Sequence, residues 1–229
     1  MDSHFESELE TLKQRLLVMA NHAETAVSRA MQALLQRDDA LALEVKQKDR
    51  VIDQIEVEID DLAIQQLTKA PLASDLRLVT VAIKIAHNLE RIGDEAAKIA
   101  KRAANLSKEP PIQMQLDIPS MASLTLAMLK AALDAFGHQE PAKARSILPR
   151  DKEVDLFNMQ IHRVLAQYMV EHPAMIKRCL QWMVVSKSLE RIADHATNIA
   201  EDVVYLYSAE AIRHTGAKGG NVSREVLAR

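Results

Sequence analysis

Two copies of one short acidic motif are the residues of this sequence best suited to chemistry. The hexapeptide LERIGD at residues 89–94 returns as LERIAD at residues 189–194. Each copy has a Glu and an Asp four residues apart, and this spacing places both side chains on one face of a helix. Like charges so placed repel each other unless a positive group lies between them. The duplication therefore indicates a bound metal ion.

A second acidic pair with the same spacing precedes each copy of the motif. In the first half, Asp53 and Glu90 lie almost equally far in sequence from a break near Pro71. If the two helices are antiparallel neighbours, both pairs lie about 27 Å from the turn at roughly 1.5 Å per residue. Each half then contributes four carboxylates at one height. The candidate metal ligands are Asp49, Asp53, Glu90, Asp94, Asp151, Asp155, Glu190 and Asp194.

The donor set predicts the class of metal. Oxygen donors without thiolates favour Mg²⁺, Mn²⁺, Fe or Ca²⁺ over structural zinc, and four carboxylates can hold more than one ion. An isolated acidic pair is common on solvated helix faces, where Arg91 and Arg191 could neutralise it. Level pairs in both halves favour metal binding. The single histidines His87, His162 and His195 are expected to be surface or packing residues.

The flanks of the two sites differ. The second motif is followed by Asn198 and Glu201, whereas lysines occupy the matching positions of the first half. Asn198 lies four residues beyond Asp194 and is expected to add an oxygen ligand, which makes the second half the better metal site. Pro149, two residues before Asp151, is expected to kink or restart the helix that contains Asp151 and Asp155.

The elements that position these acids are predicted to be helices. Hydrophobic residues make up 48% of the 229 residues, with only five Gly and seven Pro, and apolar residues recur at helical spacing. Chain breakers divide the sequence into six helical segments, three on each side of a central linker. The prediction is an all-α fold of six helices in two tandem, pseudo-symmetric three-helix bundles. The expected boundaries are a first repeat at 1–107, a linker at 108–119, a second repeat at 120–212 and a flexible tail at 213–229.

Composition excludes several classes of function. A net charge of −3 disfavours nucleic acid as the main partner. The single cysteine, Cys179, allows no intramolecular disulfide and fits a reducing cytoplasm. The longest apolar stretch, residues 78–86, falls far short of the roughly 20 residues that span a bilayer. A cytoplasmic protein is therefore expected, one that reaches a membrane only through partners.

The motifs together resemble the PhoU family. Ser-Asp-Leu-Arg at residues 74–77, the two acidic hexapeptides and their order and duplication all match that family, over nearly the whole chain. The resemblance implies paired three-helix bundles whose acidic motifs bind multinuclear metal clusters, commonly of iron or zinc. The eight acids named above are the positions to which these ligand roles transfer. The family pattern leaves Fe, Zn, Mn and Mg open as the metal.

The resemblance also implies a function that the spacing alone does not. Such a protein is a cytoplasmic adaptor, not an enzyme, and a negative regulator of the phosphate-starvation (Pho) response. Its expected partners are the ATPase subunit of the phosphate ABC transporter, a sensor histidine kinase and a second copy of itself. The alternative is a carboxylate-bridged metal bundle of the di-iron redox type. Against it, Gly93 and Ala193 stand where a di-iron Glu-x-x-His motif has its histidine.

Overall fold

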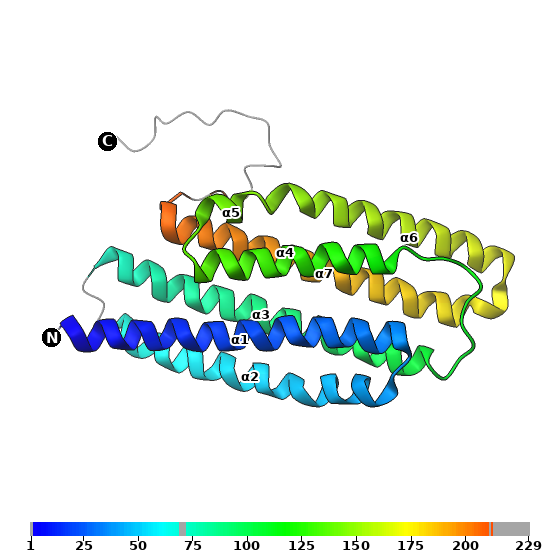
Figure 1. Cartoon of the computed structure of the whole chain (residues 1–229), viewed down its shortest axis with the longest axis horizontal. Coiled ribbons are helices and arrows are strands. Elements are labelled where there is room, and N and C mark those ends of the chain that lie inside the picture. Colours follow the sequence, from blue (N-terminus) through cyan, green and yellow to red (C-terminus); the bar gives the residue numbers. More distant parts are fainter. Residues whose placement is uncertain (1, 69–71, 211, 213–229) are drawn as a thin grey trace.

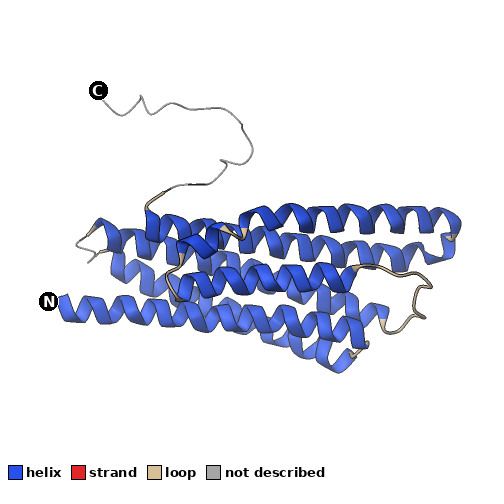
Figure 2. Cartoon of the chain, turned by 45° about the horizontal axis from the view of Figure 1, so that its top comes forward, coloured by secondary structure: helices blue, strands red, loops and turns tan. Residues whose placement is uncertain are grey.

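The computed structural model describes residues 2–68, 72–210 and 212, and these form helices and loops without strands (Figures 1 and 2). Six long helices confirm the predicted all-α fold, and a short helix and two 3₁₀ turns are added between them. The helices are α1 (Asp2–Gln36), α2 (Asp39–Leu67), α3 (Ala73–Leu106), α4 (Ile118–Gly137), α5 (Pro141–Arg145), α6 (Asp151–Glu171) and α7 (Ile176–Ser208).

The long helices form two bundles of three. Helices α1, α2 and α3 pack against one another, and α4, α6 and α7 form the second set, with α3 lying along α7 between the two sets (Figure 1). Hydrogen bonds between α3 and α7 pair early residues of one helix with late residues of the other, so the two helices are antiparallel. Helix α3 is consequently covered on three sides.

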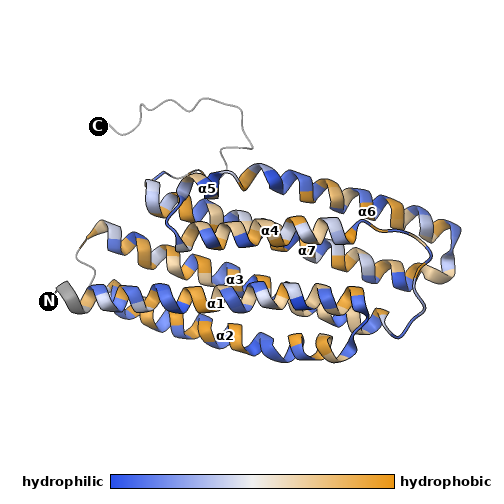
Figure 3. Cartoon of the chain, in the orientation of Figure 1, coloured by the Kyte–Doolittle hydropathy of each residue, from blue (hydrophilic) through white to orange (hydrophobic). Residues whose placement is uncertain are grey.

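Aliphatic stripes at helical spacing build the core. On α1, Leu12, Leu16, Met19 and Ala23 are all fully buried, and apolar and polar residues are interspersed along every long helix (Figure 3). Full burial of each large aliphatic side chain stabilises the fold by about 1.5–3 kcal/mol. The stripes therefore fix which face of each helix turns inward, and with it the face that presents the acids.

Local signals set the helix ends near the predicted breaks. Asp38 caps α2 by accepting a hydrogen bond from the Leu41 amide at 2.9 Å. Helix α3 ends at Leu106 and α4 begins at Ile118, two residues before the predicted start of the second repeat. Pro71 and the predicted tail at 213–229 lie outside the described residues.

Pro149 separates the two halves in local geometry. It lies in a 3₁₀ turn (Leu148–Arg150), and α6 starts immediately after it at Asp151, as the predicted restart requires. In the first half the matching Asp49 lies in the interior of α2. The first acid of the second site is thus at a helix N-terminus, where peptide dipoles favour negative charge.

Candidate metal centre

The acids of the first half occupy facing stripes on α2 and α3. These helices are antiparallel, and each step of three or four residues along α2 is matched by an equal step backwards along α3. The level is fixed at Gly93, because a Cβ placed there would lie 3.2 Å from Asp49 Oδ1 and 2.8 Å from Ile52 Cδ1. Asp49 therefore lies opposite the acidic motif, as the equal distances from the turn predicted.

Proximity and burial alter the acidity of this first set. Burial first, and then the negative charges of Asp53 and Asp94, raise the pKa of Asp49 to about 6 against the opposing charge of Lys98. Burial also raises the pKa of Glu90, with Asp94 among the charges that add to this effect. The first half thus concentrates negative charge in a partly desolvated place, which a cation would stabilise.

The second half repeats this arrangement between α6 and α7. Desolvation and the charges of Glu190, Asp151 and Asp155 together raise the pKa of Asp194 to about 6. Burial raises the pKa of Asp151 as well, although Thr197 donates a hydrogen bond to its Oδ1 at 3.4 Å. All four predicted acids of the second half therefore act on one another.

One glutamate in each set has a buried oxygen whose partner is a cation on its own helix. Oε2 of Glu90 and Oε2 of Glu190 are both inaccessible to solvent. Each has only an ion pair with a neighbour on its own helix, to Arg91 Nε at 3.2 Å and to Lys187 Nζ at 2.5 Å. A buried carboxylate oxygen without a hydrogen bond is costly unless another positive group satisfies it. A metal ion at the Glu190 oxygen would compete with Lys187, whereas the Glu90 oxygen has only the longer contact to Arg91.

Asn198 does not lie where the sequence predicted. Its amide Nδ2 lies 3.5 Å from Asn88 Oδ1 on α3, so this side chain is turned toward the other half of the molecule. The residue beside the acids is Thr197. The spacing predicts that Asn198 lies on the same helix face as Asp194. It cannot show that Asn88 of α3 lies within hydrogen-bonding reach of the Asn198 amide.

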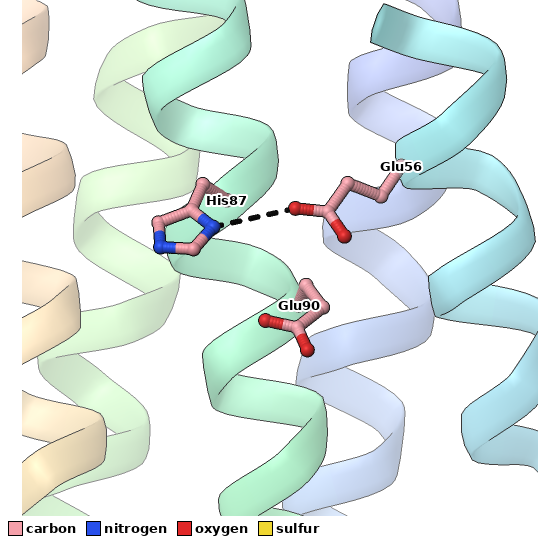
Figure 4. A group of neighbouring side chains, drawn as sticks. All are labelled: Glu56, His87 and Glu90. Carbon is pink, nitrogen blue, oxygen red and sulfur yellow. Dashed lines mark hydrogen bonds and ion pairs between the residues drawn. The ribbon is translucent and has the colours of Figure 1, made fainter.

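Two further residues lie beside the first acidic set: Glu56, which was not predicted, and His87, which was expected to be a surface or packing residue. Glu56 on α2 and His87 on α3 lie one step beyond Asp53 and Glu90, with His87 Nδ1 3.4 Å from Glu56 Oε1 (Figure 4). Ligand atoms of Glu56, His87 and Glu90 all lie within 4.8 Å of one another, the one such group of three among the described residues. The antiparallel register was the signal that could have revealed them.

The other two histidines have packing roles, as expected. His162 lies 3.2 Å from the Met183 carbonyl oxygen, and His195 Nδ1 lies 2.9 Å from Asn88 Oδ1. Burial lowers the pKa of His195. Both rings are thereby fixed by partners other than the acids.

Buried polar contacts join α3 to α7 next to the two acidic motifs. Ser188 Oγ donates to Glu95 Oε2 at 2.7 Å, and Arg191 Nη1 donates to Glu95 Oε1 at 3.2 Å. In the matching places of the other half stand His195 and Asn88, which also contact each other. The two contacts are related by the same pseudo-symmetry as the acidic sets.

Comparison with known proteins explains the duplication. The family model described as the PhoU domain matches this chain twice, at residues 16–103 and 118–203. The chain belongs to the PhoU family. It is 39% identical to a phosphate-specific transport system accessory protein PhoU homolog of Pseudomonas aeruginosa, over 94% of this chain and 90% of that protein. A homolog from Thermotoga maritima is 34% identical over 93% and 91% of the two chains.

Solved PhoU structures share the fold. The crystal structure of PhoU from P. aeruginosa superposes with a TM-score of 0.88 at 39% identity, covering 90% of this chain and all of that one. A structure described as the phosphate transport system regulatory protein PhoU from Streptococcus pneumoniae gives a TM-score of 0.84 at 30% identity, covering 91% and 99%. Among the described residues, no helix is both long enough and apolar enough to cross a bilayer.

Proposed function

We propose that this PhoU-family protein is a cytoplasmic regulatory adaptor of phosphate transport. It connects the ATPase subunit of the phosphate ABC transporter to a sensor histidine kinase, represses the phosphate-starvation response and restrains uptake when phosphate is plentiful. The observation that supports this proposal is the match of both halves to proteins named as accessory to, or regulatory of, phosphate transport. An adaptor needs surfaces and not a catalytic centre, and the homodimer implied by the resemblance stays a prediction.

The second part of the proposal is that both acidic sets bind metal. The residues fit a hard or borderline cation, because each set combines four carboxylates, and the buried glutamate oxygen of each set already has a cation beside it. Asp49, Asp53, Glu90 and Asp94 would hold it in the first half, and Asp151, Asp155, Glu190 and Asp194 in the second. The bound charge would offset the repulsion between the acids and hold two helices of each half together.

The regulatory proposal is tested by genetics and by co-purification. A strain lacking the gene should express alkaline phosphatase in high phosphate, and the wild-type gene should restore repression. Affinity-tagged protein should retain the transporter ATPase and the kinase. Repression that persists in high phosphate without the gene would overturn the adaptor proposal.

The metal proposal needs a separate measurement. Protein purified without chelators should contain stoichiometric metal and lose thermal stability in EDTA, whereas a variant with the eight acids changed to Asn or Gln should not. Asp60→Asn with Asp61→Asn, two exposed acids of α2 outside both sets, is the matched control. Metal-free wild-type protein with a melting point indifferent to EDTA would contradict metal binding while leaving the adaptor proposal standing. Stoichiometric iron with oxygen consumption would favour the redox alternative.

A further inference from the structure

The ladder of ligand residues in the first half is longer than the two acidic pairs. Along α2 the positions are 49, 53 and 56, and along α3 they are 94, 90 and 87, so that each residue faces one on the other helix. We call the Glu56 and His87 pair, together with the adjacent Glu90, the third rung. It lies at the end of the row nearer to the turn between α2 and α3.

The geometry of the third rung suits a divalent ion. Two carboxylates from two helices and one imidazole have ligand atoms within 4.8 Å of one another, so small side-chain adjustments would bring all three to one ion at metal–ligand distances of about 2.0–2.2 Å. The His87 side chain is 58% exposed and that of Glu56 is 24% exposed, so an ion can enter from solvent. Glu90 Oε2, in contrast, is buried, and Arg91 Nε on the same helix lies 3.2 Å from it. Figure 4 shows the three side chains converging from α2 and α3.

The second half has its own cation at the matching place. The residues that correspond to Glu56 and His87 there are Asn158 and Lys187. The Lys187 ammonium lies 2.5 Å from Glu190 Oε2, the counterpart of the Glu90 oxygen. Asn158 Oδ1 accepts a hydrogen bond from Ser186 Oγ at 2.6 Å and is thereby satisfied within the protein. The Lys187 ammonium of the second half thus corresponds in position to the His87 imidazole of the first half.

We propose that Glu56, His87 and Glu90 form a divalent-metal site with mixed nitrogen and oxygen ligands, in the first half only. The ion there takes the place that the Lys187 ammonium takes in the second half. An imidazole ligand selects borderline ions such as Zn²⁺ or Fe²⁺ over Mg²⁺ and Ca²⁺. The two halves therefore differ in metal preference, with the nitrogen ligand giving the first half the tighter site for zinc. This inference deepens the proposed metal binding and shares one residue, Glu90, with it.

The test uses Zn²⁺ as the probe on the full chain. Isothermal titration should find a Zn²⁺ site in the wild type that His87→Lys removes, with affinity falling by at least about 100-fold, since even outer partners of a ligand contribute 10–100-fold. Nitrogen-15 NMR of the imidazoles should show the His87 ring shifting on Zn²⁺ addition. His22→Lys, at an exposed histidine of α1 outside any acidic set, is the matched control and should bind like the wild type. Unchanged His87 resonances at saturating Zn²⁺ would overturn the proposal.

Two further variants separate this inference from the proposed function. Asp49→Asn with Asp53→Asn and Asp94→Asn removes the carboxylate set of the first half but keeps the third rung, and the His87 shift should persist in it. Asn158→Glu with Lys187→His should create an additional Zn²⁺ site in the second half. If the triple variant loses metal and His87→Lys does not, the third rung is contradicted and the carboxylate site is not. The reverse pattern contradicts the carboxylate site alone.

Discussion

Asp49 and Asp194 hold their protons more tightly than ordinary aspartates, and each belongs to a different half. In both cases desolvation comes first and the neighbouring carboxylates add to it, which brings the pKa from 3.8 to about 6. Without metal, the folded state therefore binds more protons than the unfolded state between about pH 4 and pH 6. The ionised forms of these two side chains consequently oppose folding at neutral pH, and this opposition disappears at low pH, where both are protonated.

At the residue scale, the metal-free protein should lose stability as pH rises from about 4 to 6, whereas metal affinity should increase over the same interval. Asp49→Asn should stabilise the metal-free protein at pH 7 by up to about 1 kcal/mol, less than the shift alone implies, because solvent screens the site. Urea denaturation in EDTA at several pH values measures this. A variant that is less stable than the wild type at pH 7 would contradict it.

The types and spacing of the acids were enough to predict that each acidic pair shares one helix face, because the helical period is about 3.6 residues. Glu56 and His87 could not be recognised in the same way, since each is single on its own helix and only the pairing of α2 with α3 joins them. The position of the Asn198 side chain could not be predicted for a related reason. Its partner, Asn88, belongs to the other half, and contacts between halves have no local signature.

At the scale of elements, the distance between α2 and α3 depends on Gly93. An added Cβ would press on the end of Ile52 and on the Asp49 carboxylate, and both side chains are flexible enough to shift. The helix ends were predictable from Asp38 and the prolines. The short α5 was not, because five residues are too few to show a helical period.

Gly93→Ala should change the free energy of unfolding by less than about 1 kcal/mol, since the gain in helix propensity offsets the crowding. Its metal affinity should nevertheless fall, because Asp49 must move. Gly93→Leu should destabilise by about 1–3 kcal/mol through overpacking. Ala193→Gly, at the matching position of the second half, is the control and should cost about 1 kcal/mol from propensity alone. Far-UV circular dichroism with urea measures stability, and equal losses in all three variants would contradict this account.

At the scale of the whole molecule, the contact between α3 and α7 connects the two metal-site candidates. Glu95 is 4% exposed, directly follows Asp94 and accepts hydrogen bonds from Ser188, Arg191 and Lys98. Burial pushes the pKa of Glu95 up, but the hydrogen bonds with Lys98 and Ser188 and the positive charges outweigh it, so the pKa lies below the ordinary value. The carboxylate form thus stabilises the fold above the ordinary glutamate pKa.

Glu95→Ala should destabilise the protein by about 1–3 kcal/mol at pH 7, because the buried Ser188 hydroxyl loses its partner. The difference from the wild type should shrink as pH falls through the lowered pKa of Glu95, where the wild type also loses the charge. Glu109→Ala, which removes the ion pair between an exposed carboxylate and the partly buried Arg178, is the control and should cost less than about 1 kcal/mol. Because Glu95 joins the halves, its loss should also split a single urea transition into two. A single transition with an unchanged slope would mean that apolar packing between α3 and α7 is sufficient to couple the halves.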